Sequence, residues 1–139
     1  MGISRSGYVD FVSTEWNATR FIPDDCSDCV SEAGHTTGYH IYQLNEDPNP
    51  RMGFMSTKQD SVIADVFVGI GGEAFEAALL TGTEALSAAH PERFRSLIAD
   101  GTSHTFLQAQ FSREVEGIPA YQWVADTLIG SADWRSLSA

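Results

Sequence analysis

The second half of the sequence alternates short apolar runs with longer amphipathic segments, and this alternation limits the folds open to the chain. Runs of strand length are each followed by a polar loop, and helical spacing of apolar residues fills the intervals between them. The segments are a short buried strand at Arg51–Ser56, one helix or two short ones from Gly72 to the residue before Pro91, a strand at Phe94–Ala99 and a helix at Ala120–Ile129. This order predicts an α/β fold with a parallel sheet flanked by helices.

The first half carries weaker signals. They are a strand end at Gly7–Val12, a helix start at Ser13–Arg20 and a loop at Pro23–Asp28. Turn-forming residues cluster at Asn45–Arg51 and predict a surface loop between the two halves. Because 139 residues suffice for one core, we expect a single partial domain, irregular or helical over 1–50 and strand–helix–strand–helix over 51–139.

Charge and hydropathy exclude several classes of partner. Eight Lys+Arg against 19 Asp+Glu leave a net charge of −11, which would repel nucleic acid or an anionic membrane surface. The longest apolar run, Ser61–Ile70, is interrupted by Asp65 and is far shorter than the ~20 residues of a membrane span. Met1–Asp10 lacks the apolar core of a signal peptide, so a secretion signal would lie outside this chain.

Two polar residues follow the predicted strands of the second half. Asp60 comes after the first and His104 after the second, and loops at the carboxyl ends of parallel strands meet at one edge of a sheet. A carboxylate that accepts the Nδ1–H of an imidazole prepares the ring to take a proton from a hydroxyl nucleophile. From spacing alone, a solvated loop acid and an ordinary loop histidine are the simpler interpretation.

Several motifs add a resemblance to a known family. They are Asp100-Gly-Thr-Ser-His104-Thr-Phe-Leu107, Val115-Glu-Gly-Ile118, Gln122-Trp123-Val124 and Trp134, and, earlier in the chain, Ser6-Gly7-Tyr8, Trp16-Asn17, Phe21-Ile22-Pro23 and the pair Cys26 and Cys29. In this order they resemble the carboxyl-terminal part of the pectin acetylesterases, a family of α/β-hydrolases that includes the Notum carboxylesterases. The resemblance covers most of the chain.

The resemblance implies roles for two residues. Asp60, in Ser56-Thr-Lys-Gln-Asp60, matches the triad acid, and His104 matches the triad base. It implies hydrolysis of an acyl ester, such as an acetylated polysaccharide, through an acyl-serine, with no metal or organic cofactor and in a secreted or extracytoplasmic protein. The Gly-x-Ser-x-Gly nucleophile elbow of such enzymes is missing, because Gly2-Ile-Ser4-Arg-Ser6 has serine in place of the second glycine. We therefore expect the nucleophile to lie outside this chain.

Two other functions remain open. One is a non-catalytic acidic α/β remnant or binding module, or a fragment that needs a complementary amino-terminal half to cover its sheet edge. The other is dinucleotide binding, because Gly69-Ile-Gly-Gly-Glu-Ala74 follows the apolar run Val62–Val68 and opens a helix. Asp65 within that run speaks against the buried strand that this motif requires.

The cysteines and tryptophans also allow more than one role. Cys26 and Cys29 have the C-x-x-C spacing of a redox pair, of half a zinc site completed by His35 and His40, or of a short disulfide. Trp123 and Trp134 lie on or near the terminal helix, where an aromatic stripe usually packs in the core. We expect these two tryptophans to be packing residues.

Overall fold

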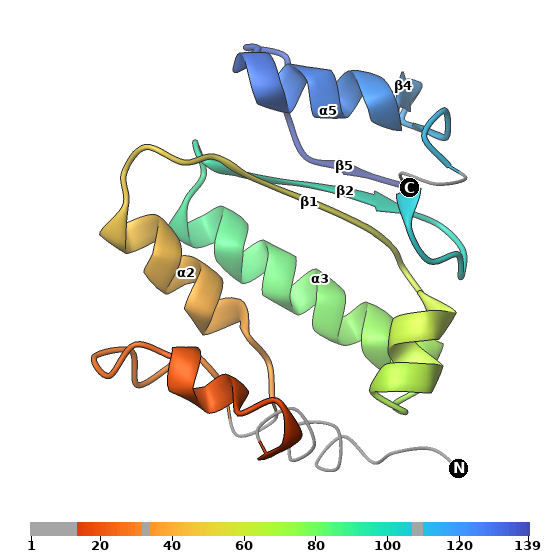
Figure 1. Cartoon of the computed structure of the whole chain (residues 1–139). Helices are drawn as coiled ribbons and strands as arrows, with labels where there is room; N and C mark the ends of the chain where they lie inside the picture. The colour runs from red at the N-terminus through yellow and green to blue at the C-terminus, as the bar shows by residue number, and fades with distance from the viewer. Residues whose placement is uncertain (1–13, 32–33, 107–109) are drawn as a thin grey trace.

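A parallel sheet lies at the centre of the chain in the computed structural model, which describes residues 14–31, 34–106 and 110–139 (Figure 1). Its strands are β1 (Met52–Thr57), β2 (Phe94–Ala99) and β5 (Leu137–Ser138), in the order β1-β2-β5. β1 pairs with β2 in parallel along its whole length, with Thr57 opposite Ala99. The predicted α/β class, a parallel sheet flanked by helices, is confirmed.

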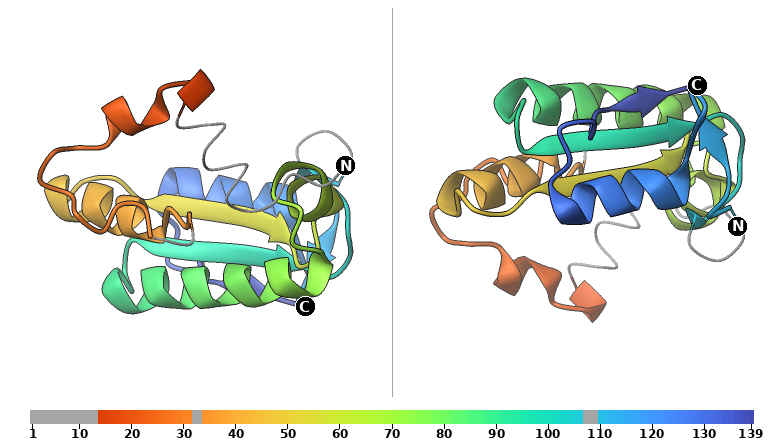
Figure 2. Two further views of the ribbon diagram at one scale, coloured as in Figure 1. Left: turned by 90° about the horizontal axis from the view of Figure 1, so that it is seen from below. Right: turned by 90° about the horizontal axis from the view of Figure 1, so that it is seen from above.

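Helices cover both faces of this sheet. α2 (Thr37–Glu46) and α3 (Gly72–Ala89) lie on one face and α5 (Ala120–Ile129) on the other (Figures 1 and 2). The remaining elements are the short helices η1 (Ala18–Phe21) and η2 (Val62–Phe67) and a hairpin of β3 (Glu114–Val115) and β4 (Ile118–Pro119). Within the described ranges, no helix has the length and hydropathy that a membrane span requires.

The core consists of two clusters, one on each face of β2. Successive side chains of a strand point to opposite faces, so Phe94 packs with Leu44 and Leu86 beneath α2 and α3. On the opposite face Leu97 joins the cluster under α5. The other buried members of that cluster are Ala99, Phe106, Val115, Ala120, Trp123, Trp134 and Leu137. The two tryptophans are buried, as expected, with ring centroids 6.1 Å apart.

The second-half elements lie close to their predicted positions. α3 is one continuous helix that ends just before Pro91, and Gly82 within it lies against Thr37 of α2: a Cβ atom at Gly82 would be 3.0 Å from the Thr37 hydroxyl. α5 ends at Gly130, whose φ of 67° is in the left-handed region that glycine adopts readily. β1 begins and ends one residue later than expected.

Three predictions were wrong in part. β1 was expected to be buried, but it is an edge strand, and Phe54 is 38% exposed. The first half, expected to be irregular or helical, contains α2 at a position that the sequence did not indicate. The loop predicted at Asn45–Arg51 therefore starts only after Glu46. Of the helix start expected at Ser13–Arg20, Thr14 and Glu15 are helical, but the helix does not continue: a 3-10 helix follows, preceded by Asn17, whose φ is 50°.

The remaining predictions concern the run Val62–Val68, the first residues of the chain and the loop at Pro23–Asp28. Val62–Val68 is not a strand, because Val62–Phe67 forms the π-helical turn η2. The strand end at Gly7–Val12 lies outside the described residues, as do the serines of Gly2–Ser6 and Leu107 of the family motif. The segment Pro23–Asp28 contains turns and neither helix nor strand, which confirms the predicted loop.

Candidate functional site

Asp60 lies just beyond the end of β1, and its carboxylate is fixed by the backbone that follows it. Its Oδ1 accepts hydrogen bonds from the N–H groups of Val62 and Ile63, at 3.1 and 3.0 Å. Its carbonyl oxygen accepts from the N–H of Ala64 at 2.7 Å. Asp60 thus satisfies the free N–H groups at the start of η2, where the positive end of the helix dipole favours a carboxylate.

His104 lies in the loop after β2, and its ring meets the other oxygen of the same carboxylate. Its Nδ1 is 2.7 Å from Oδ2 of Asp60. The Asp60 side chain is 8% exposed, whereas that of His104 is 37% exposed. An ionised carboxylate can only accept, so Nδ1 carries the proton in this bond, and the neutral ring presents Nε2 as an acceptor.

The loops that carry Asp60 and His104 are joined by backbone hydrogen bonds. These bonds extend the β1–β2 pairing beyond the ends of the strands. They run from the N–H groups of Lys58, Gln59 and Ser61 to the carbonyls of Ala99, Gly101 and Thr102, at 2.9, 3.0 and 3.0 Å. The sheet therefore brings the two predicted site residues together through the connection of their loops.

An ion pair borders the site. Nζ of Lys58 is 2.7 Å from Oδ1 of Asp100, and this hydrogen bond raises the pKa of the Lys58 ammonium above its usual value. The Asp100 side chain is 67% exposed, so the pair is solvated and adds little stability. Sequence reasoning did not single out Lys58, because a lysine and an aspartate 42 positions apart carry no pairing signal until β1 and β2 are aligned.

The predicted cysteine pair lies far from this site along the chain. Cys26 and Cys29 form a disulfide, and Cys29 is completely buried. Sulfur atoms bonded to each other cannot ligate zinc as thiolates, so half a zinc site is not formed. Nδ1 of His40 is 3.3 Å from Oε1 of Gln43, and the described part of the chain has no cluster of three or more His, Cys, Asp or Glu suited to a metal.

The glycine string of the nucleotide alternative lacks its structural context. A dinucleotide fingerprint follows a strand, but Gly69–Ala74 follows the helical turn η2. Gly72 packs against the side chain of Gln59, so that a Cβ atom there would lie 3.0 Å from the Gln59 Cβ. These glycines therefore make a tight entry into α3, and the structure does not support the dinucleotide alternative.

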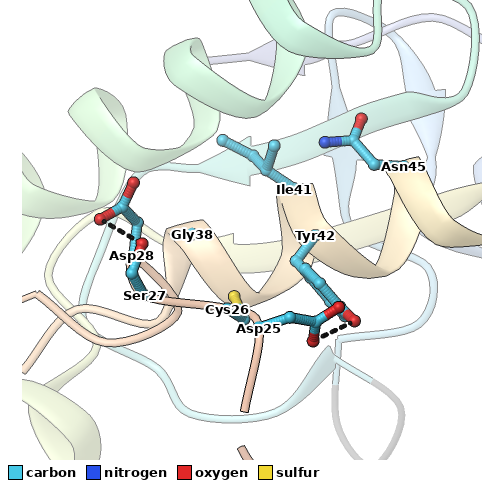
Figure 3. Close-up of a pocket in the computed structure, with 8 residues that line it drawn as sticks. All are labelled: Asp25, Cys26, Ser27, Asp28, Gly38, Ile41, Tyr42 and Asn45. Carbon is cyan, nitrogen blue, oxygen red and sulfur yellow. Dashed lines mark hydrogen bonds between the residues drawn. The ribbon is translucent and has the colours of Figure 1, made fainter. Parts of the chain in front are cut away.

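A cavity of about 300 Å³ lies between the disulfide loop and α2 (Figure 3). Asp60 and His104 do not line it. Its lining is Asp25, Cys26, Ser27, Asp28, Gly38, Ile41, Tyr42 and Asn45. The Tyr42 hydroxyl donates to Oδ1 of Asp25 at 2.9 Å, a bond between residues 17 positions apart that the sequence did not indicate.

The Asp60–His104 pair has the arrangement of an oriented general base. Among the described residues, Nε2 of His104 forms no hydrogen bond, so it can accept a proton from a hydroxyl group brought to this edge of the sheet. Ser4 and Ser6, in the string that comes closest to a nucleophile elbow, lie outside the described ranges. Comparison of the chain with protein-family models, with curated proteins and with solved structures finds no match in any of the three.

Proposed function

We propose that this chain supplies the acid and the base of a Ser-His-Asp hydrolase that cleaves carboxylic esters. The observation that carries the proposal is the 2.7 Å bond between Nδ1 of His104 and Oδ2 of Asp60, which fixes the ring with Nε2 available. The chain order also fits, because in α/β-hydrolases the acid precedes the histidine. The serine nucleophile lies outside this chain, in accord with the resemblance to pectin acetylesterases.

The burial of the two side chains suits these roles. Asp60 is shielded, and its carboxylate accepts three hydrogen bonds, two from backbone N–H groups and one from the ring. His104 is partly exposed, so a substrate can reach its outer edge. A buried carboxylate beside an accessible imidazole stabilises the imidazolium that forms when the ring takes a proton.

The reaction has two halves that use the same ring. Nε2 of His104 takes the proton of the serine hydroxyl while the oxygen attacks the ester carbonyl, and it returns that proton to the alcohol that leaves. Water then gives a proton to Nε2 while its oxygen attacks the acyl-serine. The ring returns that proton to the serine oxygen as the acyl–oxygen bond breaks, which releases the carboxylic acid and restores the serine. Asp60 holds the ring and balances its charge throughout. The substrate class is an acyl ester, with an acetylated polysaccharide as the example that the resemblance implies.

A fluorophosphonate probe tests the proposal, because it reacts with a serine only when a base activates it. The protein that contains this chain together with the nucleophile should be labelled on one serine, identifiable by mass spectrometry. His104→Ala should abolish the labelling and lower kcat for a p-nitrophenyl ester by at least ~10³-fold. His40→Ala, in α2, is the matched control and should leave both unchanged. Full labelling of the His104→Ala protein, or no labelled serine in the parent, would contradict the proposal and favour a non-catalytic module.

A further inference from the structure

Thr57 makes a side-chain hydrogen bond between the two loops of the candidate site. Its hydroxyl donates to the carbonyl oxygen of Ser103 at 2.7 Å. Thr57 is only 1% exposed, whereas Ser103 is an exposed residue, so the hydrogen bond between them is partly buried. Removal of the Thr57 hydroxyl would delete this side-chain connection between the end of β1 and the loop that carries His104.

This hydrogen bond holds the residue directly before His104. The Ser103 carbonyl belongs to the peptide unit that leads directly into His104. On the other side of His104, Thr105 has a φ of 63°, an unfavourable value for a β-branched residue. His104 therefore lies between a peptide unit that Thr57 holds and a residue with a strained backbone.

We propose that Thr57 is the positioning residue of His104, acting through the Ser103 carbonyl to keep Nδ1 within hydrogen-bonding distance of Asp60. Neither the Asp60 carboxylate nor the His104 ring forms a hydrogen bond with the Thr57 side chain in the described part of the chain. The consequence for catalysis rests on the proposed function, but the effect on the Asp60–His104 bond does not. That bond can be measured in this chain by itself.

Substitutions at Thr57 separate the hydroxyl from the shape of the side chain. Thr57→Val keeps the branched shape and removes the donor, whereas Thr57→Ser keeps the donor and removes the methyl group. Thr57→Cys offers a thiol, which is a weaker donor than a hydroxyl. Thr83→Val is the matched control, because Thr83 is also buried and its hydroxyl donates to the Leu79 carbonyl within α3.

Imidazole NMR of the chain labelled with ¹⁵N gives a readout that a purely structural role of Thr57 would not change. The parent should show His104 as the Nδ1–H tautomer, with a proton shifted downfield by the carboxylate. Thr57→Val should lose that proton signal and shift toward the Nε2–H tautomer, while Thr57→Ser and Thr83→Val keep the parent spectrum. A folded Thr57→Val chain with the parent tautomer and proton shift would overturn the inference. If Thr57→Val does not fold, a Thr57→Cys spectrum identical to that of Thr57→Ser would overturn it.

Activity distinguishes this inference from the proposed function. In the protein that contains the nucleophile, a misplaced base should lower kcat by ~10²-fold, with rescue by Thr57→Ser. A tautomer change in Thr57→Val together with undiminished serine labelling of His104→Ala would leave the positioning role intact and refute the esterase. Loss of labelling in His104→Ala with an unchanged tautomer in Thr57→Val would do the reverse.

Discussion

Asp60 and His104 lie 44 positions apart in the sequence, and their side chains share a hydrogen bond of 2.7 Å between Oδ2 and Nδ1. The other oxygen of the same carboxylate accepts the N–H groups of Val62 and Ile63 at the start of η2. The Asp60 side chain thus caps the start of η2 and orients the His104 ring. Because different oxygens perform the two tasks, substitution can separate them.

Asp60→Asn should keep the helix start and lose the ring orientation. The asparagine oxygen can still accept from Val62 and Ile63, but its amide group donates, so Nδ1 of His104 must become the acceptor and the proton moves to Nε2. That tautomer cannot act as a base, and we expect kcat in the nucleophile-bearing protein to fall by ~10³–10⁴-fold. Imidazole NMR of the chain alone checks the tautomer.

Asp60→Ala removes both the cap of η2 and the orientation of the His104 ring, and it is compared with Asp60→Asn. Loss of the carboxylate leaves the N–H groups of η2 without their acceptor, which should cost ~0.5–2 kcal/mol of stability, as for other helix caps. Urea unfolding of the parent, Asp60→Asn and Asp60→Ala chains measures the difference. Equal stability of the alanine and asparagine variants would argue against a capping role for Oδ1.

Tyr42 should titrate at unusually high pH. Its hydrogen bond to Asp25, together with burial and the carboxylates of Asp25 and Glu46, raises the pKa of the phenol to about 12. A raised pKa means that the neutral phenol is favoured in the folded chain, so its contribution to stability is complete below pH ~10 and is lost as the pH rises toward 12. Ultraviolet difference absorbance of tyrosinate measures this titration.

Two variants assign that titration to the hydrogen bond. Tyr42→Phe should remove the highest tyrosine step, which identifies it. Asp25→Asn should move the step toward the ordinary tyrosine pKa, because the bond to Asp25 is its largest cause. A step that stays near its original pH in Asp25→Asn would show that the hydrogen bond is not responsible.

The elements that the sequence predicted well are those whose own residues determine them. Phe94–Ala99 is an apolar run that becomes the central strand β2, buried along nearly its whole length. Ala120–Ile129 ends where Gly130 takes a left-handed conformation. The proximity of Asp60 and His104 could also be predicted, because each follows a recognisable strand and the carboxyl ends of adjacent parallel strands lie together.

The elements that the sequence missed depend on contacts made by distant residues. α2 has only one fully buried side chain, Leu44, with Ile41 packed beside it, and no side-chain hydrogen bond caps its start, so the sequence offers neither a long apolar stripe nor a capping residue there. The run Val62–Phe67 has β-branched residues typical of a strand. It becomes helical where Asp60 accepts its first N–H groups, which periodicity does not reveal.

Gly38 should not tolerate a side chain. A Cβ atom there would lie 1.8 Å from the Asp28 carbonyl oxygen, which belongs to the backbone and cannot rotate away. Gly38→Ala should therefore push the disulfide loop off α2 and destabilise the chain by ~1–3 kcal/mol, in spite of the better helix propensity of alanine. Thermal unfolding under oxidising conditions measures this loss.

Gly82→Ala is the matched control for Gly38→Ala. It is the same substitution in a neighbouring helix, but its new Cβ atom would meet only the side-chain hydroxyl of Thr37, at 3.0 Å. A small adjustment of that side chain relieves the contact, and the gain in helix propensity of up to ~1 kcal/mol offsets the remaining strain. Equal destabilisation by the two variants would contradict the close approach at Gly38.

The cluster under α5 should contribute far more to stability than the exposed end of that helix. Leu97 is completely buried in β2, and Leu97→Ala leaves a cavity that should cost ~2–5 kcal/mol. Leu128 is 81% exposed on α5, and Leu128→Ala should change stability by no more than ~0.5 kcal/mol. Denaturant unfolding of both variants tests the arrangement of the sheet and α5 together. A large loss in Leu128→Ala would mean that another surface covers this end of α5 in solution, and a small loss in Leu97→Ala would contradict the packing of β2 against α5.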